Sequence, residues 1–200
     1  MNTNYLPALR RLAALAVLGI LLTAGVARSH AQAITIYARF ANGTGVWAGE
    51  VTDPGRLGWV KLKSVNFGAA ITASGGTFSP PTFDSVVLTK VVDRLTPQIF
   101  ATLTSATPIN GGSGVADVTI DFTRPGPSDA VTFFRIELRL VIMVEQKSAS
   151  TDGDELVTET VTMKNTAFRY THWTILANGT QGASVVRSWS TGNNTATFTP

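Results

Sequence analysis

The sequence predicts an all-β protein, mainly antiparallel, in which about seven strands form a small barrel or sandwich with one short flanking α-helix. Most apolar segments alternate apolar with polar residues, which is the pattern of half-buried strands. Clusters of Gly, Pro, Asn and Asp separate these segments. A convincing helix start occurs at one place. Residues 34–200 are long enough for a single domain with its own core.

The expected strands follow one another at residues 34–40, 59–67, 83–90, 115–122, 133–145, 157–173 and 183–189. The alternation changes phase near Ser64 and around residues 165–167, which predicts a bulge in each of those two strands. Apolar side chains occupy every second position from Phe134 to Val144, so residues 133–145 are expected to form one strand of roughly 40 Å, at about 3.3 Å per residue.

Residues 68–81, between the second and third strands, are small, uncharged and rich in Gly and Pro. The segment contains the pairs Gly75-Gly76 and Pro80-Pro81. It has too little apolar surface to fold on itself, so it is expected to be a loop that is either mobile or ordered by a partner.

The helix is expected to begin at Thr96, directly after a strand. Thr96 has the side chain of an N-cap, and Pro97 suits the first helical position because its missing N–H would be unpaired there in any case. Leu95 and Phe100 have the spacing of a hydrophobic staple, so Phe100 is expected to dock on the sheet.

Residues 1–33 have the composition of an export signal peptide. Two arginines precede an apolar run, and the small residues after it predict cleavage after Ala31 or Ala33. The run is shorter than the roughly 20 residues that a membrane-spanning helix needs. We therefore expect a bacterial protein exported to the periplasm or the medium, by either the general or the twin-arginine route, with no membrane contact after cleavage.

Charge and cysteine content exclude several classes of function. Three of the 16 basic residues leave with the signal peptide, so 13 basic and 13 acidic side chains remain. A mature chain without net charge has no general attraction to nucleic acid. The chain has no cysteine, which excludes disulfides, thiol catalysis and thiolate metal sites.

No motif indicates an enzyme, a metal site or a cofactor. His172 is the single histidine of the mature chain, and it lacks a set of partner residues for catalysis. Residues 152–155 are acidic but lack the alternating pattern of a calcium loop. The glycine clusters lack the lysine of a phosphate-binding loop. We expect no catalytic, cofactor-binding or metal-binding residues.

The order of these segments resembles the Hcp (haemolysin-coregulated protein) family, the tube subunits of bacterial type VI secretion. The similarity extends over nearly all of residues 34–190, and its most specific part is the strand-to-helix stretch with Lys90, Asp93 and Thr96-Pro97. The other matching stretches are ITIYARF, GEVTD, VKLKSVNFG, FRIELRLVIMVEQKSAS, TETVTMKNTAFRYTHW and SVVRSWS.

The resemblance implies a small β-barrel with one flanking helix that assembles with its own copies into hexameric rings, which stack into a tube. It also implies spike, sheath or effector proteins as further partners, and no catalysis. It places residues 68–81 where the family has a loop that contacts the next ring, which makes Ala73, Gly75, Gly76 and Phe78 stacking candidates.

One face of the expected strand at 133–145 is a candidate ring interface. Its charges alternate in sign and then give way to apolar side chains, which suits a contact that must be specific in register. The candidate residues are Arg135, Glu137, Arg139, Val141 and Met143. The alternative is a solvated face with ion pairs worth well under about 1 kcal/mol each.

An export signal is not part of the family pattern, so two functions remain open. The first is an exported ring or tube subunit. The second is a monomeric periplasmic or extracellular β-domain that binds a small ligand or carries cargo.

Overall fold

The computed structural model describes residues 33–109 and 116–200. The signal peptide and its cleavage sites therefore lie outside the described residues. The elements are β1 Thr35–Asn42, β2 Gly45–Val46, β3 Val60–Asn66, β4 Ala69–Ala70, β5 Ala73–Ser74, β6 Thr77–Phe78, β7 Thr82–Phe83, β8 Val86–Val91, α2 Thr96–Ser105, β9 Val118–Pro125, β10 Ala130–Arg139, β11 Ile142–Ala149, β12 Thr158–Lys164, β13 Ala167–Ile175 and β14 Gln181–Ser190.

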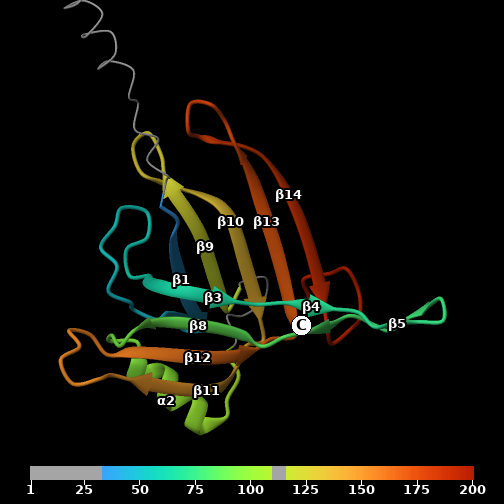
Figure 1. Cartoon of the computed structure of the whole chain (residues 1–200), viewed down its shortest axis with the longest axis horizontal. Helices are drawn as coiled ribbons and strands as arrows, with labels where there is room; N and C mark the ends of the chain where they lie inside the picture. The colour runs from blue at the N-terminus through green and yellow to red at the C-terminus, as the bar shows by residue number, and fades with distance from the viewer. Residues whose placement is uncertain (1–32, 110–115) are drawn as a thin grey trace, which may run out of the picture. The chain divides into compact units, whose positions relative to one another are not determined.

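Ten of the described strands form one large antiparallel sheet in the order β11-β12-β8-β3-β1-β9-β10-β13-β14, with β2 added to β1 (Figure 1), while β4 pairs with β7 and β5 with β6 in two small separate sheets. The predicted all-β class with one short helix is confirmed. The number of described strands is higher than expected, because two of the expected long strands are each divided and because β2 and the short strands β4 to β7 lie in segments that were expected to be loops or strand ends. The sheet is open within the described residues, since β11 and β14 are the ends of the path and do not pair with each other.

The core lies between two groups of strands that belong to this sheet. Figure 1 shows β3, β8, β12 and β11 running across the view, while β9, β10, β13 and β14 rise from them. Fully buried side chains from both groups share one apolar cluster, including Leu88, Met163, Ile120, Ile136 and Leu138.

The predicted strand at 133–145 is wrong, because the chain leaves β10 at Arg139 and starts β11 at Ile142. Leu140 lies between them in the left-handed region, with φ 47°. This conformation ends the regular alternation, and the buried positions shift by one residue. Ile136 and Leu138 are buried in β10, but Val141 and Met143 are the buried residues after the break.

The second predicted long strand is also divided, at Asn165 and Thr166, between β12 and β13. A bulge was expected here, but the chain passes from one end of the sheet to the other. The backbone N–H of Thr166 donates to the carbonyl of Arg139 at 3.0 Å. The two breaks therefore lie side by side and form one corner of the fold.

Helix α2 begins at Thr96 with Pro97 in its first turn, as predicted. The prediction that Thr96 is the N-cap is wrong: Leu95 occupies the cap position, and no side chain caps the helix. The Thr96 hydroxyl instead donates to Glu159 Oε1 at 2.6 Å and accepts from the backbone N–H of Asp93 at 3.1 Å.

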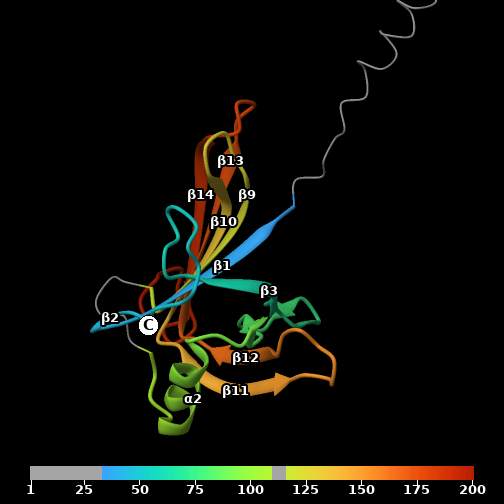
Figure 2. The same cartoon turned by 90° about the vertical axis from the view of Figure 1, so that its left-hand side faces the viewer.

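The expected docking of Phe100 is wrong as well, because its side chain is 59% exposed. Ile99 is fully buried and Leu95 nearly so, while Leu103 packs partly against the core. These three residues are spaced four apart and form one stripe along the helix. The helix lies against β11 (Figure 2). Its stripe of Leu95, Ile99 and Leu103 is the buried side, whereas Phe100 is exposed.

A buried ion cluster ties the start of α2 to the sheet. Lys90 Nζ of β8 contacts Asp93 Oδ1 at 2.6 Å and also pairs with Glu159 of β12. Gln146 Nε2 of β11 donates to Glu159 Oε2 at 2.6 Å. Burial opposes the ionisation of Glu159, but hydrogen bonds from Lys90, Thr96 and Gln146 outweigh it and hold the pKa of Glu159 below its usual value.

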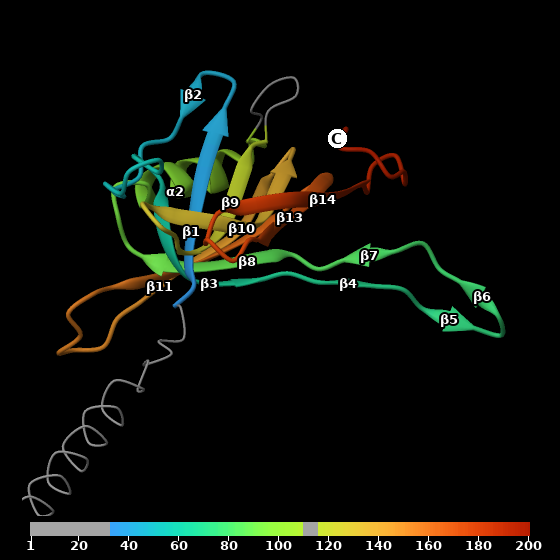
Figure 3. The same cartoon turned by 90° about the horizontal axis from the view of Figure 1, so that it is seen from above.

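Residues 68–83 form a hairpin arm, not the loop that was expected. In Figure 3, β4 and β7, followed by β5 and β6, run out from the ends of β3 and β8. Gly75 and Gly76 form the turn between β5 and β6, both at positive φ (57° and 83°). Two such residues in succession are typical of the two-residue type I′ turn that continues the twist of a hairpin.

Candidate functional site

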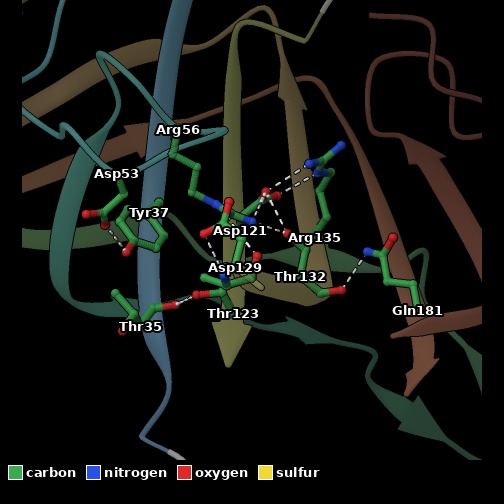
Figure 4. Close-up of polar contacts among 11 residues, drawn as sticks. Thr35, Tyr37, Asp53, Arg56, Asp121, Thr123, Asp129, Thr132, Arg135 and Gln181 are labelled. Atoms are coloured by element: carbon green, nitrogen blue, oxygen red, sulfur yellow. Dashed lines mark hydrogen bonds and ion pairs between the residues drawn. The ribbon is translucent and has the colours of Figure 1, made fainter. Parts of the chain in front are cut away.

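The candidate site is the outer face of β1, β9, β10 and β13, together with the edge strand β14. Asp121 of β9 is almost fully buried, and Figure 4 shows the polar side chains around it. Arg135 Nε and Nη2 donate to Asp121 Oδ1 and Oδ2 at 2.6 and 2.8 Å. Thr132 Oγ1 donates to Asp121 Oδ2 at 3.0 Å, and Arg56 Nη2 lies 3.5 Å from the same oxygen.

A loop covers this polar face. Arg56 reaches back from residues 49–58, donates to the carbonyl of Ala130 at 3.2 Å, and stacks over the ring of Tyr37 at 5.2 Å. The Tyr37 hydroxyl donates to Asp53 of the same loop. Burial, the hydrogen bond to Asp53 and the charge of Asp53 raise the pKa of Tyr37 to about 12. The sheet is therefore covered on both faces here, by the apolar core and by a polar layer.

The next part of the same face carries a second ion pair. Arg169 of β13 donates to both oxygens of Glu137 of β10, each at 2.7 Å. The hydrogen bond to Glu137 raises the pKa of Arg169 above its ordinary value, against the opposing effect of burial. Arg139 Nη1 donates to the carbonyl of Phe198 at 3.1 Å. Both arginines thus meet residues of their own chain.

The structure brings together three of the five predicted interface residues. Arg135, Glu137 and Arg139 share the outer face of β10 and are half-buried by intrachain contacts. Val141 and Met143 lie in the core, so the prediction that they form an apolar end of this face is wrong. The phase shift at Leu140 is the reason.

Sequence reasoning missed the outer edge of β14, which pairs with β13 alone among the other named strands. Val185 is 58% exposed and Val186 is 43% exposed. Successive residues of a strand point to opposite faces, so both faces of β14 are uncovered at this point. The strand carries one charged residue, Arg187, and no proline. The sequence did contain an indication of this surface, because the adjacent Val185 and Val186 break the alternation of apolar and polar residues.

The stacking candidates Ala73, Gly75, Gly76 and Phe78 all lie on the hairpin arm, and all are exposed. Phe78 is 70% exposed, although it is a large aromatic side chain. The arm therefore presents apolar surface to its surroundings.

His172 is exposed on β13. Within residues 33–109 and 116–200, no group of three or more His, Asp or Glu side chains could hold a metal ion. No helix in the described part of the chain is long and apolar enough to span a bilayer.

A family profile described as "Type VI secretion system effector, Hcp" matches residues 34–175. Comparison with curated protein sequences gives no match.

Solved structures share the fold. One described as "Structure of a type six secretion system protein" superposes with a TM-score of 0.71 at 16% identity, over 82% of this chain and 99% of that chain. Hcp1 from E. coli EAEC 042 gives 0.64 at 15% identity, over 80% of this chain and 99% of its own. Hcp1 from Salmonella typhimurium gives 0.62 at 14% identity, over 81% and 97%.

Proposed function

Because this chain belongs to the Hcp family of type VI secretion proteins, we propose that it is a non-enzymatic subunit that assembles with copies of itself into hexameric rings. The ring size follows the family. The observation that carries the proposal is the uncovered edge of β14. A long exposed edge strand offers unpaired backbone groups to another chain, and proteins usually protect such an edge with charge or proline. Here the strand carries two exposed valines, a single charged residue, Arg187, and no proline.

A contact between this edge and a different surface of the next copy is heterologous, and such contacts close into rings when the rotation between copies permits. The exposed apolar arm then contacts the next ring, so that rings stack into a tube. Spike, sheath and effector proteins are proposed as further partners.

We also propose that residues 1–33 export the protein, with a mature N-terminus at Gln32 or Ile34. Mass spectrometry of the protein recovered from its host measures this directly.

The ring proposal is tested by sedimentation and electron microscopy of the secreted protein. Wild type is expected to form rings. Val185→Lys combined with Val186→Lys is expected to leave folded monomers, because charges at the edge oppose pairing. Leu156→Lys, at a similarly exposed position on the β11–β12 turn, is the matched control and is expected to assemble.

Wild-type protein that remains monomeric at high concentration would contradict the ring proposal. It would favour the second function, a monomeric domain that binds a small ligand. A groove of about 450 Å³, lined by Glu50, Asp53, Lys61 and Lys63 around an apolar floor, is of a size suited to such a ligand.

A further inference from the structure

The C-terminal segment, residues 191–200, folds back on the sheet after β14. Ser190 pairs with Ala167 of β13 and also forms an antiparallel bridge with Thr195. A strand residue with two partners has them on opposite sides, so Thr195 lies on the outer side of β14. The backbone N–H of Ser190 donates to the Thr195 carbonyl at 2.8 Å. The tail therefore occupies the C-terminal end of the edge that the proposed ring contact uses.

Phe198 anchors this segment. It is half-buried, whereas the other nine residues of 191–200 are exposed. Its ring lies 4.4 Å from the guanidinium carbon of Arg169 and 5.7 Å from that of Arg139. Its carbonyl accepts the hydrogen bond from Arg139. Arg169 is held in place by its two hydrogen bonds to Glu137, so it presents a fixed flat cation to the aromatic ring.

The pairing register of β10, β13 and β14 explains how so short a segment reaches Arg139 and Arg169. Arg139, Ala167 and Ser190 lie in one row across β10, β13 and β14. Thr195 extends the row at the outer edge, and Phe198 returns over it to Arg139. The tail thus covers both the end of the β14 edge and the charged face of β10 and β13.

We propose that residues 191–200 are a latch that holds the exported subunit as a monomer until the tail is displaced by a second copy. The inference rests on the proposed ring function. The edge and the tail compete for the same backbone groups of β14, so a neighbouring strand pairs along the whole edge only after Thr195 leaves it. The contact of Phe198 with the two arginines sets the equilibrium between the bound and the released tail. A few partly exposed contacts of this kind favour the bound tail about tenfold, or by about 1.4 kcal/mol.

The test compares the concentration at which rings form for wild type, Phe198→Ala and a chain ended after Ala196. Both changes are expected to lower this concentration about tenfold. Phe198→Trp keeps an aromatic ring over the arginines and is expected to behave as wild type or assemble later. Thr199→Ala, which removes an exposed neighbouring side chain, is the control and is expected to change nothing.

A second measurement does not depend on assembly. In monomeric protein, hydrogen exchange at the Ser190 amide is expected to be about tenfold faster in Phe198→Ala than in wild type, because opening of the tail exposes that N–H. Unchanged exchange shows that Phe198 does not hold the tail and overturns the latch.

The assembly outcomes separate the two proposals. If wild type and both tail variants form rings at the same concentration, the latch is wrong and the ring function stands. If the variants assemble less well than wild type, the tail is part of the interface and the latch is again wrong. If neither wild type nor the variants form rings at any concentration, both proposals fail together.

Discussion

At the scale of single residues, the fold perturbs the ionisation of Tyr37. Its hydroxyl is enclosed by β1 and the loop that carries Asp53 and Arg56 (Figure 4). Burial and the neighbouring Asp53 carboxylate both disfavour the phenolate, and the pKa of Tyr37 rises from 10.0 to about 12. The guanidinium of Arg56 opposes this effect only in part.

This raised pKa predicts a loss of stability in alkali. Between pH 10 and 12 the unfolded chain releases the Tyr37 proton, whereas the folded chain keeps it. The stabilisation is present below pH 10 and is lost as the pH rises through this window. Urea unfolding from pH 9 to 12 measures it. Tyr37→Phe is expected to have a shallower decline, and an equal decline in both proteins would show that Tyr37 is not responsible.

At the scale of elements, the sequence pattern placed Phe100 on the buried face of α2, whereas in the structure its neighbour Ile99 is buried and Phe100 is exposed. Leu95, Ile99 and Leu103 meet the sheet, while Phe100 projects from the side of this stripe. The ion cluster of Lys90, Asp93 and Glu159 fixes the start of the helix and therefore its rotation.

Alanine substitutions separate the two neighbours on this helix. Ile99→Ala is expected to lower the free energy of unfolding by about 2–5 kcal/mol, because it opens a cavity in the core. Phe100→Ala is expected to lower it by about 0.5 kcal/mol or less, since an exposed ring is removed. Denaturant titration measures both, and a large loss for Phe100→Ala in monomeric protein would contradict the arrangement of the helix.

At the scale of the whole molecule, two exposed apolar surfaces lie outside the packed core and do not contribute to it. In the arm, β4 pairs with β7 and β5 pairs with β6, and Ile71 and Phe78 remain exposed. The edge of β14 is similar, with exposed valines beyond its pairing to β13. Both surfaces therefore serve contacts between copies in the proposed function.

Replacement of residues 71–81 by Asn-Gly tests this separation of the arm from the core, because Ala70 and Thr82 are paired and a two-residue turn can join them. The free energy of unfolding of the monomer is expected to change by less than about 1 kcal/mol, because exposed hairpin tips tolerate change. Rings are expected to form, and stacked tubes are expected to be lost. Phe78→Thr is a milder variant that should weaken stacking alone. Tubes of normal length from the shortened protein, seen by electron microscopy, would assign stacking to another surface.

The sequence alone determined the class of the fold and the family. Alternation of apolar and polar residues is a local property, so it located most strands correctly, as it did at Ile34 to Phe40. Thr96-Pro97 located the start of the helix for a similarly local reason. The family resemblance depended on the order of such segments and is confirmed by the match over residues 34–175.

The tertiary structure decided which side of each segment is buried. Apolar side chains occupy every second position from Phe134 to Val144, and only the left-handed turn at Leu140, formed at the corner with Thr166, reverses the faces of this run. Asp117 and Asp121 alternate as a polar face would, yet they are buried, because distant segments cover that face of the sheet. The alternation of apolar and polar residues indicates that a strand has two different faces. Which surfaces are covered, and by what, depends on residues far away in the chain, and no local pattern contains that information.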